Sequence, residues 1–349
     1  VGPSPGRQAI PAMAAPQASG GEGDVTPGVP FVEAAVAVRL PAELGEGSIW
    51  DARSGRLLWL DVLAARLYRF EPKTGVNEEY DLSAHSKNVT SVVPLAAEHD
   101  PTGDKVGVTL REGFAVYDIG TRALTVLPGN PPVAARERFN DGKVDPAGRY
   151  WAGTIARDAQ GEPVAEAALY RRNVDGSIDK VLTPVAISNG IVWTKDTKTM
   201  YYTDTPSARV DAFDYDVSTG EVTNRRPCIT GFVFTSTGFP DGSTIDSEGM
   251  LWVARFNGGC AGRYDPATGK LLAEVRVPAA AGRQVTSVAF GGEGLGDLYL
   301  TTAHEFETAE EAAAAGRPLA GCLFVVRGAD LKRLGAAPGQ PVNQLRCAL

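Results

Sequence analysis

A segment pattern that recurs six times along the 349-residue chain constrains its fold more than any other feature. In each copy a polar residue is followed by a small or apolar run, an Asp/Gly turn and an apolar strand. The copies begin at positions 46, 91, 140, 189, 241 and 287, at intervals of 45, 49, 49, 52 and 46 residues. Periods of this length are typical of propeller blades. Six copies therefore predict an all-β fold, a six-bladed β-propeller.

The segments between the copies supply the remaining strands of each blade. They contain strand pairs joined by turns, for example around Gly220 and Gly269, so each period holds about four short strands. Residues 31–40 and 321–328 are expected to pair and close the ring, which hides the sheet edges. Residues 305–316 are the only expected short helix. We expect residues 31–349 to form a single propeller domain after a disordered Pro-, Gly- and Ala-rich lead-in over residues 1–30.

The third copy, around residues 138–154, contains two reverse-turn sequences. Asn-Asp-Gly begins at Asn140 and Asp-Pro-Ala-Gly begins at Asp145. Pro presets φ, Gly supplies positive φ, and Asx side chains bond to nearby backbone. We expect a turn, a short strand, a second turn and a strand over residues 150–154, and we assign no chemistry to Asp141 or Asp145.

Charge and composition exclude several classes of partner. The net charge is −8 and the isoelectric point is near 5.1, whereas a nucleic-acid-binding face must be basic. No apolar run approaches the roughly 20 residues that cross a bilayer. The four cysteines show no C-x-x-C spacing and suggest neither a zinc knuckle nor a disulfide framework. We expect a cytoplasmic monomer that acts on a small molecule, with no nucleic-acid or membrane partner.

The first residues of the copies are candidates for a cation site. The innermost strands of a propeller all run along its axis in the same direction, so equivalent positions should form a ring at one mouth of the channel. Four of the six offer carboxylate or amide oxygens, which suit calcium, magnesium, manganese and zinc. A lone Asn-Gly or Asp-Gly pair is more often a turn, and the shared repeat position is what favours a site. The six residues are Glu46, Ser91, Asn140, Asn189, Asp241 and Ser287.

Several sequence words resemble the senescence marker protein/regucalcin and gluconolactonase family of six-bladed propellers. These words are Arg-Phe-Asn-Asp-Gly-Lys-Val-Asp-Pro-Ala-Gly-Arg-Tyr from Arg138, Ile-Ser-Asn-Gly from Ile187, Pro-Asp-Gly from Pro240 and Phe-Asn-Gly-Gly from Phe256. The similarity runs from about residue 31 to beyond residue 328, and it is greatest to the animal regucalcin branch.

The resemblance implies one divalent metal ion, Ca, Zn, Mn or Mg, held by a Glu, an Asn and an Asp. These fall on Glu46, Asn189 and Asp241 of this sequence. One departure from the family is Ser48, where many relatives have Pro directly after the Glu-Gly of the metal site. This change could alter the rigidity of that turn.

The resemblance also implies substrate contacts and an activity. The substrate-binding Arg and Asn of the family fall on Arg138 and Asn140, and a further acidic contact falls on Asp158. The expected reaction is metal-dependent hydrolysis of a gluconolactone-like sugar lactone to the aldonic acid, with Asp241 as catalytic general base as well as ligand. Two alternatives stay open: a related metal-dependent organophosphate or ester hydrolase, and a calcium-binding regulatory propeller without catalysis.

Overall fold

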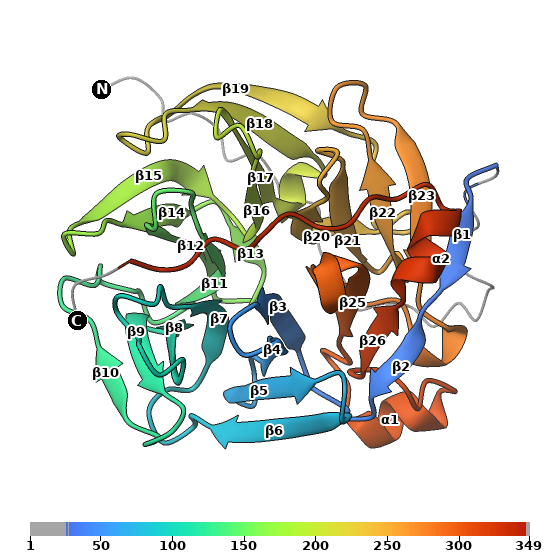
Figure 1. Cartoon of the computed structure of the whole chain (residues 1–349), viewed down its shortest axis with the longest axis horizontal. Coiled ribbons are helices and arrows are strands. Elements are labelled where there is room, and N and C mark those ends of the chain that lie inside the picture. Colours follow the sequence, from blue (N-terminus) through green and yellow to red (C-terminus); the bar gives the residue numbers. More distant parts are fainter. Residues whose placement is uncertain (1–25, 27, 347–349) are drawn as a thin grey trace.

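The chain forms six small sheets arranged in a ring (Figure 1). The computed structural model describes residue 26 and residues 28–346. Each sheet is one blade of four antiparallel strands, and blade 5 carries an additional parallel edge strand. This arrangement confirms the predicted six-bladed propeller. Most of the predicted lead-in, residues 1–25 and 27, lies outside the described residues, as does Cys347.

The blades follow one another along the chain. Blade 1 consists of β3 Gly45–Asp51, β4 Arg56–Asp61, β5 Arg66–Glu71 and β6 Val76–Asp81, and blade 2 of β7 Val89–Pro94, β8 Lys105–Leu110, β9 Gly113–Asp118 and β10 Leu124–Val126. Blade 3 consists of β11 Glu137–Val144, β12 Tyr150–Arg157, β14 Ala167–Arg172 and β15 Ile178–Val185, with β13 Pro163–Val164 paired to β12. Blade 4 consists of β16 Ser188–Trp193, β17 Thr199–Asp204, β18 Val210–Tyr215 and β19 Val222–Ile229. Blade 5 consists of β20 Phe239–Ile245, β21 Leu251–Phe256, β22 Cys260–Tyr264 and β23 Leu271–Arg276.

Blade 6 closes the ring with strands from both ends of the chain. It consists of β24 Val285–Gly291, β25 Asp297–Thr302, β26 Leu323–Val326 and β2 Ala35–Val38. The antiparallel pairing of β2 with β26 confirms the predicted closure. The prediction of a single strand over residues 31–40 was wrong, because the chain changes sheet at Ala34. The preceding segment, β1 Phe31–Glu33, pairs in parallel with β23 of blade 5.

Helices are few and short in the described chain. The α-helices are α1 Ala309–Ala314 and α2 Gly328–Arg333, and the 3-10 turns are η1 Thr205–Ser207, η2 Ala279–Ala281 and η3 Glu293–Leu295. Helix α1 lies within the predicted helical segment, and Thr308 and Glu311 form a capping box at its start. Within the described residues, no helix has the length and apolar character needed to cross a membrane.

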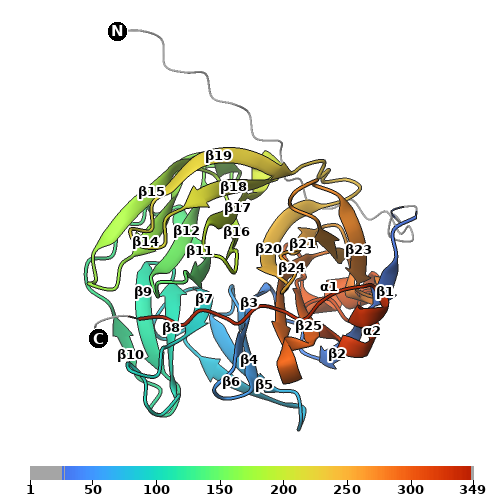
Figure 2. The same ribbon diagram turned by 45° about the horizontal axis from the view of Figure 1, so that its top comes forward.

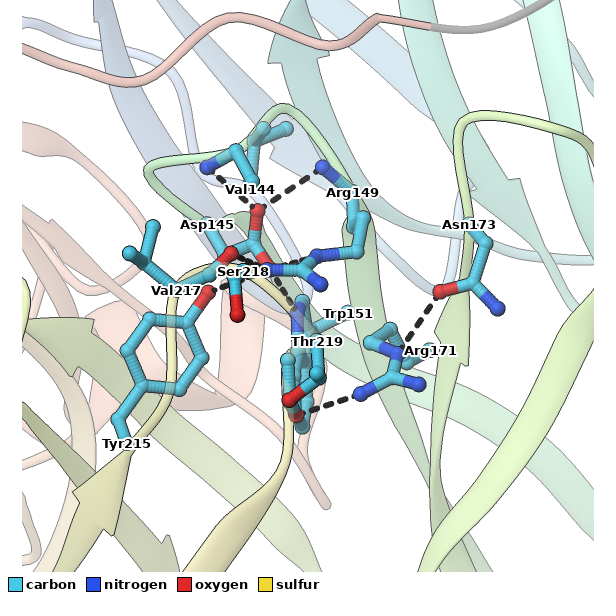
Figure 3. Close-up of polar contacts among 12 residues, drawn as sticks. Val144, Asp145, Arg149, Trp151, Arg171, Asn173, Tyr215, Val217, Ser218 and Thr219 are labelled. Carbon is cyan, nitrogen blue, oxygen red and sulfur yellow. Dashed lines mark hydrogen bonds and ion pairs between the residues drawn. The ribbon is translucent and has the colours of Figure 1, made fainter.

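Buried aspartates stabilise the turns between the first and second strands of blades 3 and 5. In blade 3, Asp145 Oδ1 accepts the backbone N–H groups of Ala147 and Arg149, at 2.9 and 3.0 Å. Its Oδ2 accepts hydrogen bonds from Arg149 Nε, Trp151 Nε1 and Tyr215 OH, at 2.7, 2.8 and 2.8 Å (Figure 3). Because Tyr215 belongs to β18, this network joins blade 3 to blade 4. Asp145 is therefore a structural residue, as the turn sequence indicated.

The C-terminal residues 334–346, here called the strap, cross one face of the ring (Figures 1 and 2). Near its start the strap forms a β-bridge between Gly339 and Asp246, and near its end one between Leu345 and Leu95. Asp246 and Leu95 directly follow innermost strands β20 and β7. The strap therefore covers the face at which the innermost strands end, opposite the mouth at which they begin.

Candidate active site at the mouth of the channel

The innermost strand of every blade contains a β-bulge close to its beginning. A bulge adds one residue to a strand and re-aims the side chains beside it, and bulges are frequent next to active sites. Six bulges at the same end of the ring direct polar side chains towards the mouth of the channel. The register shifts lie between Glu46 and Ile49, Val89 and Ser91, Phe139 and Gly142, Asn189 and Ile191, Pro240 and Ser243, and Val285 and Val288.

The bulge in β11 corrects the predicted turn at Asn140. Strand β11 is paired with β12 on both sides of the bulge, so the Asn-Asp-Gly sequence lies inside a strand rather than in a reverse turn. The glycine is required by close packing: a Cβ on Gly142 would lie 2.7 Å from the Trp151 carbonyl oxygen and 2.8 Å from Ser91 Oγ. Asx-Gly sequences serve both turns and bulges, which is why the sequence alone did not distinguish them.

The bulges also refine the predicted ring of six polar residues. When the strands are aligned by their register, Glu46, Asn140, Asn189 and Asp241 share one position, five residues before the turn to the second strand of each blade. The two serines lie one residue later and are buried. There Ser91 Oγ lies 2.6 Å from the hydroxyl of Tyr150, and Ser287 bonds to Ser48. The serines thus join neighbouring blades.

A chain of hydrogen bonds connects three of the expected site residues, Arg138, Asn140 and Asn189. Arg138 Nη1 donates to Asn140 Oδ1 at 2.5 Å, and Asn140 Nδ2 donates to Asn189 Oδ1 at 3.0 Å. The other end of the Asn189 amide donates to Thr205 Oγ1 at 2.8 Å. Thr205 in turn donates to the carbonyl directly before Asp241, at 2.9 Å. The structure therefore joins side chains of blades 3 and 4 to the backbone of blade 5 and orients the Asn189 amide.

Carboxylates gather at this mouth, where the charges of Arg138 and Lys143 oppose theirs only in part. Burial, followed by the charge of Asp141, raises the pKa of Glu46 to about 8. Burial, followed by the charges of Glu46 and Asp141, raises the pKa of Asp241 well above its ordinary value. Within the described residues, Asp241 Oδ1 and Asp141 Oδ2 are buried and have no hydrogen-bond partner. Orphaned carboxylate oxygens of this kind are suited to bind a hard cation.

The expected metal ligands fit such a cation by their chemistry. Glu46 and Asp241 offer carboxylate oxygens, and Asn189 offers an amide oxygen. In the part of the chain that the structure describes, no three His, Cys, Asp or Glu side chains form a metal-binding group. Oxygen ligands of this type suit calcium, magnesium and manganese, and zinc with fewer ligands.

Asp141 and Lys143 lie directly below this mouth, although the sequence reasoning assigned chemistry to neither. Both line a void of about 10 Å³ in the channel, close to the volume that one water molecule requires. The Lys143 ammonium group donates a hydrogen bond to the carbonyl of Ser243. Burial lowers the pKa of Lys143, whereas the charges of Asp141 and Glu46 raise it. Lys143 therefore acts as the internal counter-charge to the carboxylates.

Asp158 is placed at the expected end of β12 but is engaged in its own turn. Its Oδ1 accepts the backbone N–H groups of Gln160 and Glu162, at 2.9 and 3.0 Å. The backbone N–H of Asp158 also donates to the carbonyl of Glu162, at 2.9 Å. Within the described residues, no hydrogen bond joins Asp158 to Arg138 or Asn140.

Glu305 is an acidic residue at the mouth that the sequence reasoning missed. It follows β25, and the Gln284 side chain holds its backbone from both sides, with N···Oε1 of 2.9 Å and Nε2···O of 3.3 Å. Burial raises the pKa of Glu305, and the charges of Arg138 and Arg157 oppose this rise. Glu305 lies in a loop between β25 and β26 that occurs once in the chain, so the repeat could not reveal it.

Relatives share the sequence of this chain over most of its length. It is 39% identical to regucalcin of Danio rerio over 83% of the chain and 92% of the relative. It is 38% identical to a Bacillus subtilis protein named as a sugar lactone lactonase, YvrE, over 81% of the chain and 90% of the relative.

Solved structures share the fold. Regucalcin of Agrobacterium tumefaciens, described as a calcium-binding protein, matches with a TM-score of 0.75 and 26% identity, over 91% of this chain and 99% of that one. A luciferin-regenerating enzyme matches with a TM-score of 0.71 and 30% identity, over 88% and 96%. The sequence profile of the SMP-30/Gluconolactonase/LRE-like region matches residues 44–304, which include all of the expected site residues. This chain therefore belongs to the SMP-30/gluconolactonase/LRE-like family.

Proposed function

We propose that this protein is a carboxylic ester hydrolase that opens sugar lactones to aldonic acids with the help of one divalent metal ion. The observation that carries this proposal is the hydrogen-bonded set Arg138–Asn140–Asn189, together with the buried Oδ1 of Asp241, which has no hydrogen-bond partner among the described residues. It combines a cation site with a polar substrate site at one mouth. The names of the relatives, a sugar lactone lactonase and several regucalcins, support lactone chemistry.

Glu46, Asn189 and Asp241 would hold the metal ion. When bound, a divalent ion supplies Lewis acidity to the ester and lowers the pKa of the attacking water. Its positive charge would offset the repulsion between the carboxylates of Glu46 and Asp241 and their acidic neighbours. Lys143 contributes one further positive charge from below.

The side chains would also position the lactone and accept the proton of the attacking water. Asp241, whose Oδ1 has no partner among the described residues, accepts the proton of the attacking water as general base. Arg138 stabilises negative charge that develops on the carbonyl oxygen. Asn140 orients the ring, and its amide is already fixed by Arg138 and Asn189. Asp158, through its second carboxylate oxygen, accepts a substrate hydroxyl.

Titration of acid release tests the proposal. The protein is stripped with a chelator, and calcium, magnesium, manganese or zinc is then added back in the presence of gluconolactone and a panel of other lactones. We expect release above the spontaneous rate with at least one ion and its loss on chelation. Release that is insensitive to chelation would refute the role of the metal ion.

A calcium-binding propeller without catalysis is the second candidate. It is favoured by one observation, the description of the Agrobacterium tumefaciens regucalcin as a calcium-binding protein. The same titration separates the two functions. Saturable calcium binding without acid release from any lactone in the panel would support the non-catalytic function.

A further inference from the structure

A second cavity lies at the opposite end of the channel from the candidate active site. It has a volume of about 270 Å³, near the lower end of the range for small-molecule sites. Its walls come from the final residues of the innermost strands, and residues 340–343 of the strap form one side. Ser48 and Lys143 line both this cavity and the void below the candidate active site.

The charges that line this cavity are all positive. Lys143 and Lys195 are among its lining residues, and no Asp or Glu is. This composition contrasts with the whole protein, whose net charge is −8. Lys143 is largely withdrawn from solvent and donates to the carbonyl of Ser243, whereas Lys195 is exposed at the turn between β16 and β17. An anion in the cavity would face one lysine inside and one at its edge.

The strap leaves blade 4 free at the side where Lys195 lies. One part of the strap bonds to blades 5 and 6, through Gly339 N–H to Leu295 O and Gln340 Nε2 to Asp246 O. The other part bonds to blades 2 and 3, for example through Asn343 Nδ2 to Val144 O. Across the described residues, no hydrogen bond joins the strap to the turn at 194–198. Residues of the strap and of this turn both line the cavity, which therefore lies between them.

Apolar side chains and one unsatisfied donor complete the cavity. Ile49, Trp193, Ile245, Phe290 and Val342 line it, so most of its wall is hydrophobic. Trp193 is 5% exposed, and within the described chain its buried indole N–H has no hydrogen-bond partner. Buried donors are normally satisfied, by solvent or a ligand where the protein supplies no acceptor. These features favour a ligand with an apolar body and an anionic, hydrogen-bond-accepting end.

We propose that this cavity is a binding site for a small organic carboxylate with an apolar body. The carboxylate group pairs with Lys143 and Lys195, and the apolar body packs against Trp193 and Phe290. Hydrogen bonds from ammonium groups to a carboxylate are stronger than those to a neutral acceptor, which favours an anionic ligand over a neutral one. The site is separate from the metal mouth and does not depend on lactone hydrolysis.

Binding of sodium hexanoate to the full-length, chelator-treated protein tests this site. Calorimetry is expected to show saturable binding with a dissociation constant below about 10 mM, and the fluorescence of Trp193 should change. The neutral analogue 1-hexanol should bind about tenfold more weakly or worse, because it lacks the charge. Lys195→Glu should weaken hexanoate binding by about tenfold or more. Trp193→Phe should abolish the fluorescence change.

Lys198→Glu is the matched control, since Lys198 lies in the same exposed turn but does not line the cavity. It should retain the affinity of the unchanged protein. Absence of saturable hexanoate binding up to about 10 mM would overturn the proposal. Equal losses in Lys195→Glu and Lys198→Glu would also overturn it, because they would indicate a general charge effect. Lys195 is exposed, so its substitution is expected to leave the fold intact.

Discussion

Glu46, Asp141 and Asp241 bring three carboxylates to one end of a buried channel. If all three are ionised, their charge is −3, which one divalent ion and the ammonium group of Lys143 would balance. Without the ion, burial and mutual repulsion raise the pKa of each of Glu46 and Asp241. At the residue scale, the proposed metal ion would therefore compete with the protons that the raised pKa values of Glu46 and Asp241 favour.

Stability of the chelator-treated protein should depend on pH through Glu46. Its pKa is raised to about 8 in the folded chain, from an ordinary value of 4.5. A raised carboxyl pKa means that the folded state binds the proton more tightly, so its stabilising contribution is full below pH 4.5 and is lost as pH rises through 8. Urea unfolding at several pH values should show this loss. The same pH dependence in Glu46→Gln would contradict the assignment.

Glu305 and Asp158 are two acidic candidates for contact with substrate hydroxyls. Since Asp158 Oδ1 already accepts two backbone N–H groups, we expect Glu305 to contribute more. Glu305→Gln should raise the KM for gluconolactone by about tenfold and change kcat little. For unsubstituted δ-valerolactone the KM should stay the same. A larger effect on KM from Asp158→Asn than from Glu305→Gln would reverse the order of the two residues.

At the scale of single elements, blades 3 and 5 each have a β-bulge at the mouth and an aspartate-stabilised turn at the opposite face. The bulge of the innermost strand presents side chains to the mouth, and the turn after that strand is stabilised by an aspartate, as at Asp145 and Asp246. Both aspartates bond to a tryptophan six residues later, Trp151 and Trp252. The bulge and the aspartate lie at opposite ends of the same strand, so a substitution at the aspartate can change stability without altering the site.

Loss of the Asp145 carboxylate should destabilise the junction of blades 3 and 4. Asp145→Asn breaks a buried ion pair with Arg149 and leaves that guanidinium without its carboxylate partner. We expect a cost of about 3–5 kcal/mol in the free energy of unfolding. Denaturant unfolding measures it, with Asp175→Asn in an exposed turn of the same blade as the control. Equal effects of the two substitutions would contradict the structural role of the network.

Elements that recur could be predicted from the sequence, and elements that occur once could not. The six copies predicted the blade number, and the Asx-Gly sequences placed Asn140, Asn189 and Asp241 at one position. A repeat reports only what each blade shares. It gave no signal for Glu305 in the β25–β26 loop or for the strap. The repeat also did not predict that residues 31–40 divide between two sheets, because the sequence of an extended segment does not indicate which strand it pairs with.

At the scale of the whole molecule, closure of the ring and the strap define two ends of one channel. Strand β2 completes blade 6, so residues near both ends of the chain hold the ring together. The strap then covers one end, and the open mouth presents the candidate active site. Lys143 lies between the two ends and lines the cavities on both sides. Chemistry is therefore expected at one end only, where the carboxylates are.

Asp241→Ala provides the most direct test of the central claim that this mouth hydrolyses sugar lactones with a metal ion. Acid release from gluconolactone is followed at constant pH with the ion that best activates the unchanged protein, and spontaneous hydrolysis is subtracted. We predict that the variant releases no acid above the spontaneous rate, because it lacks both a ligand and the general base, while its thermal unfolding shows that it remains folded. Near-normal turnover by the folded variant would contradict the account.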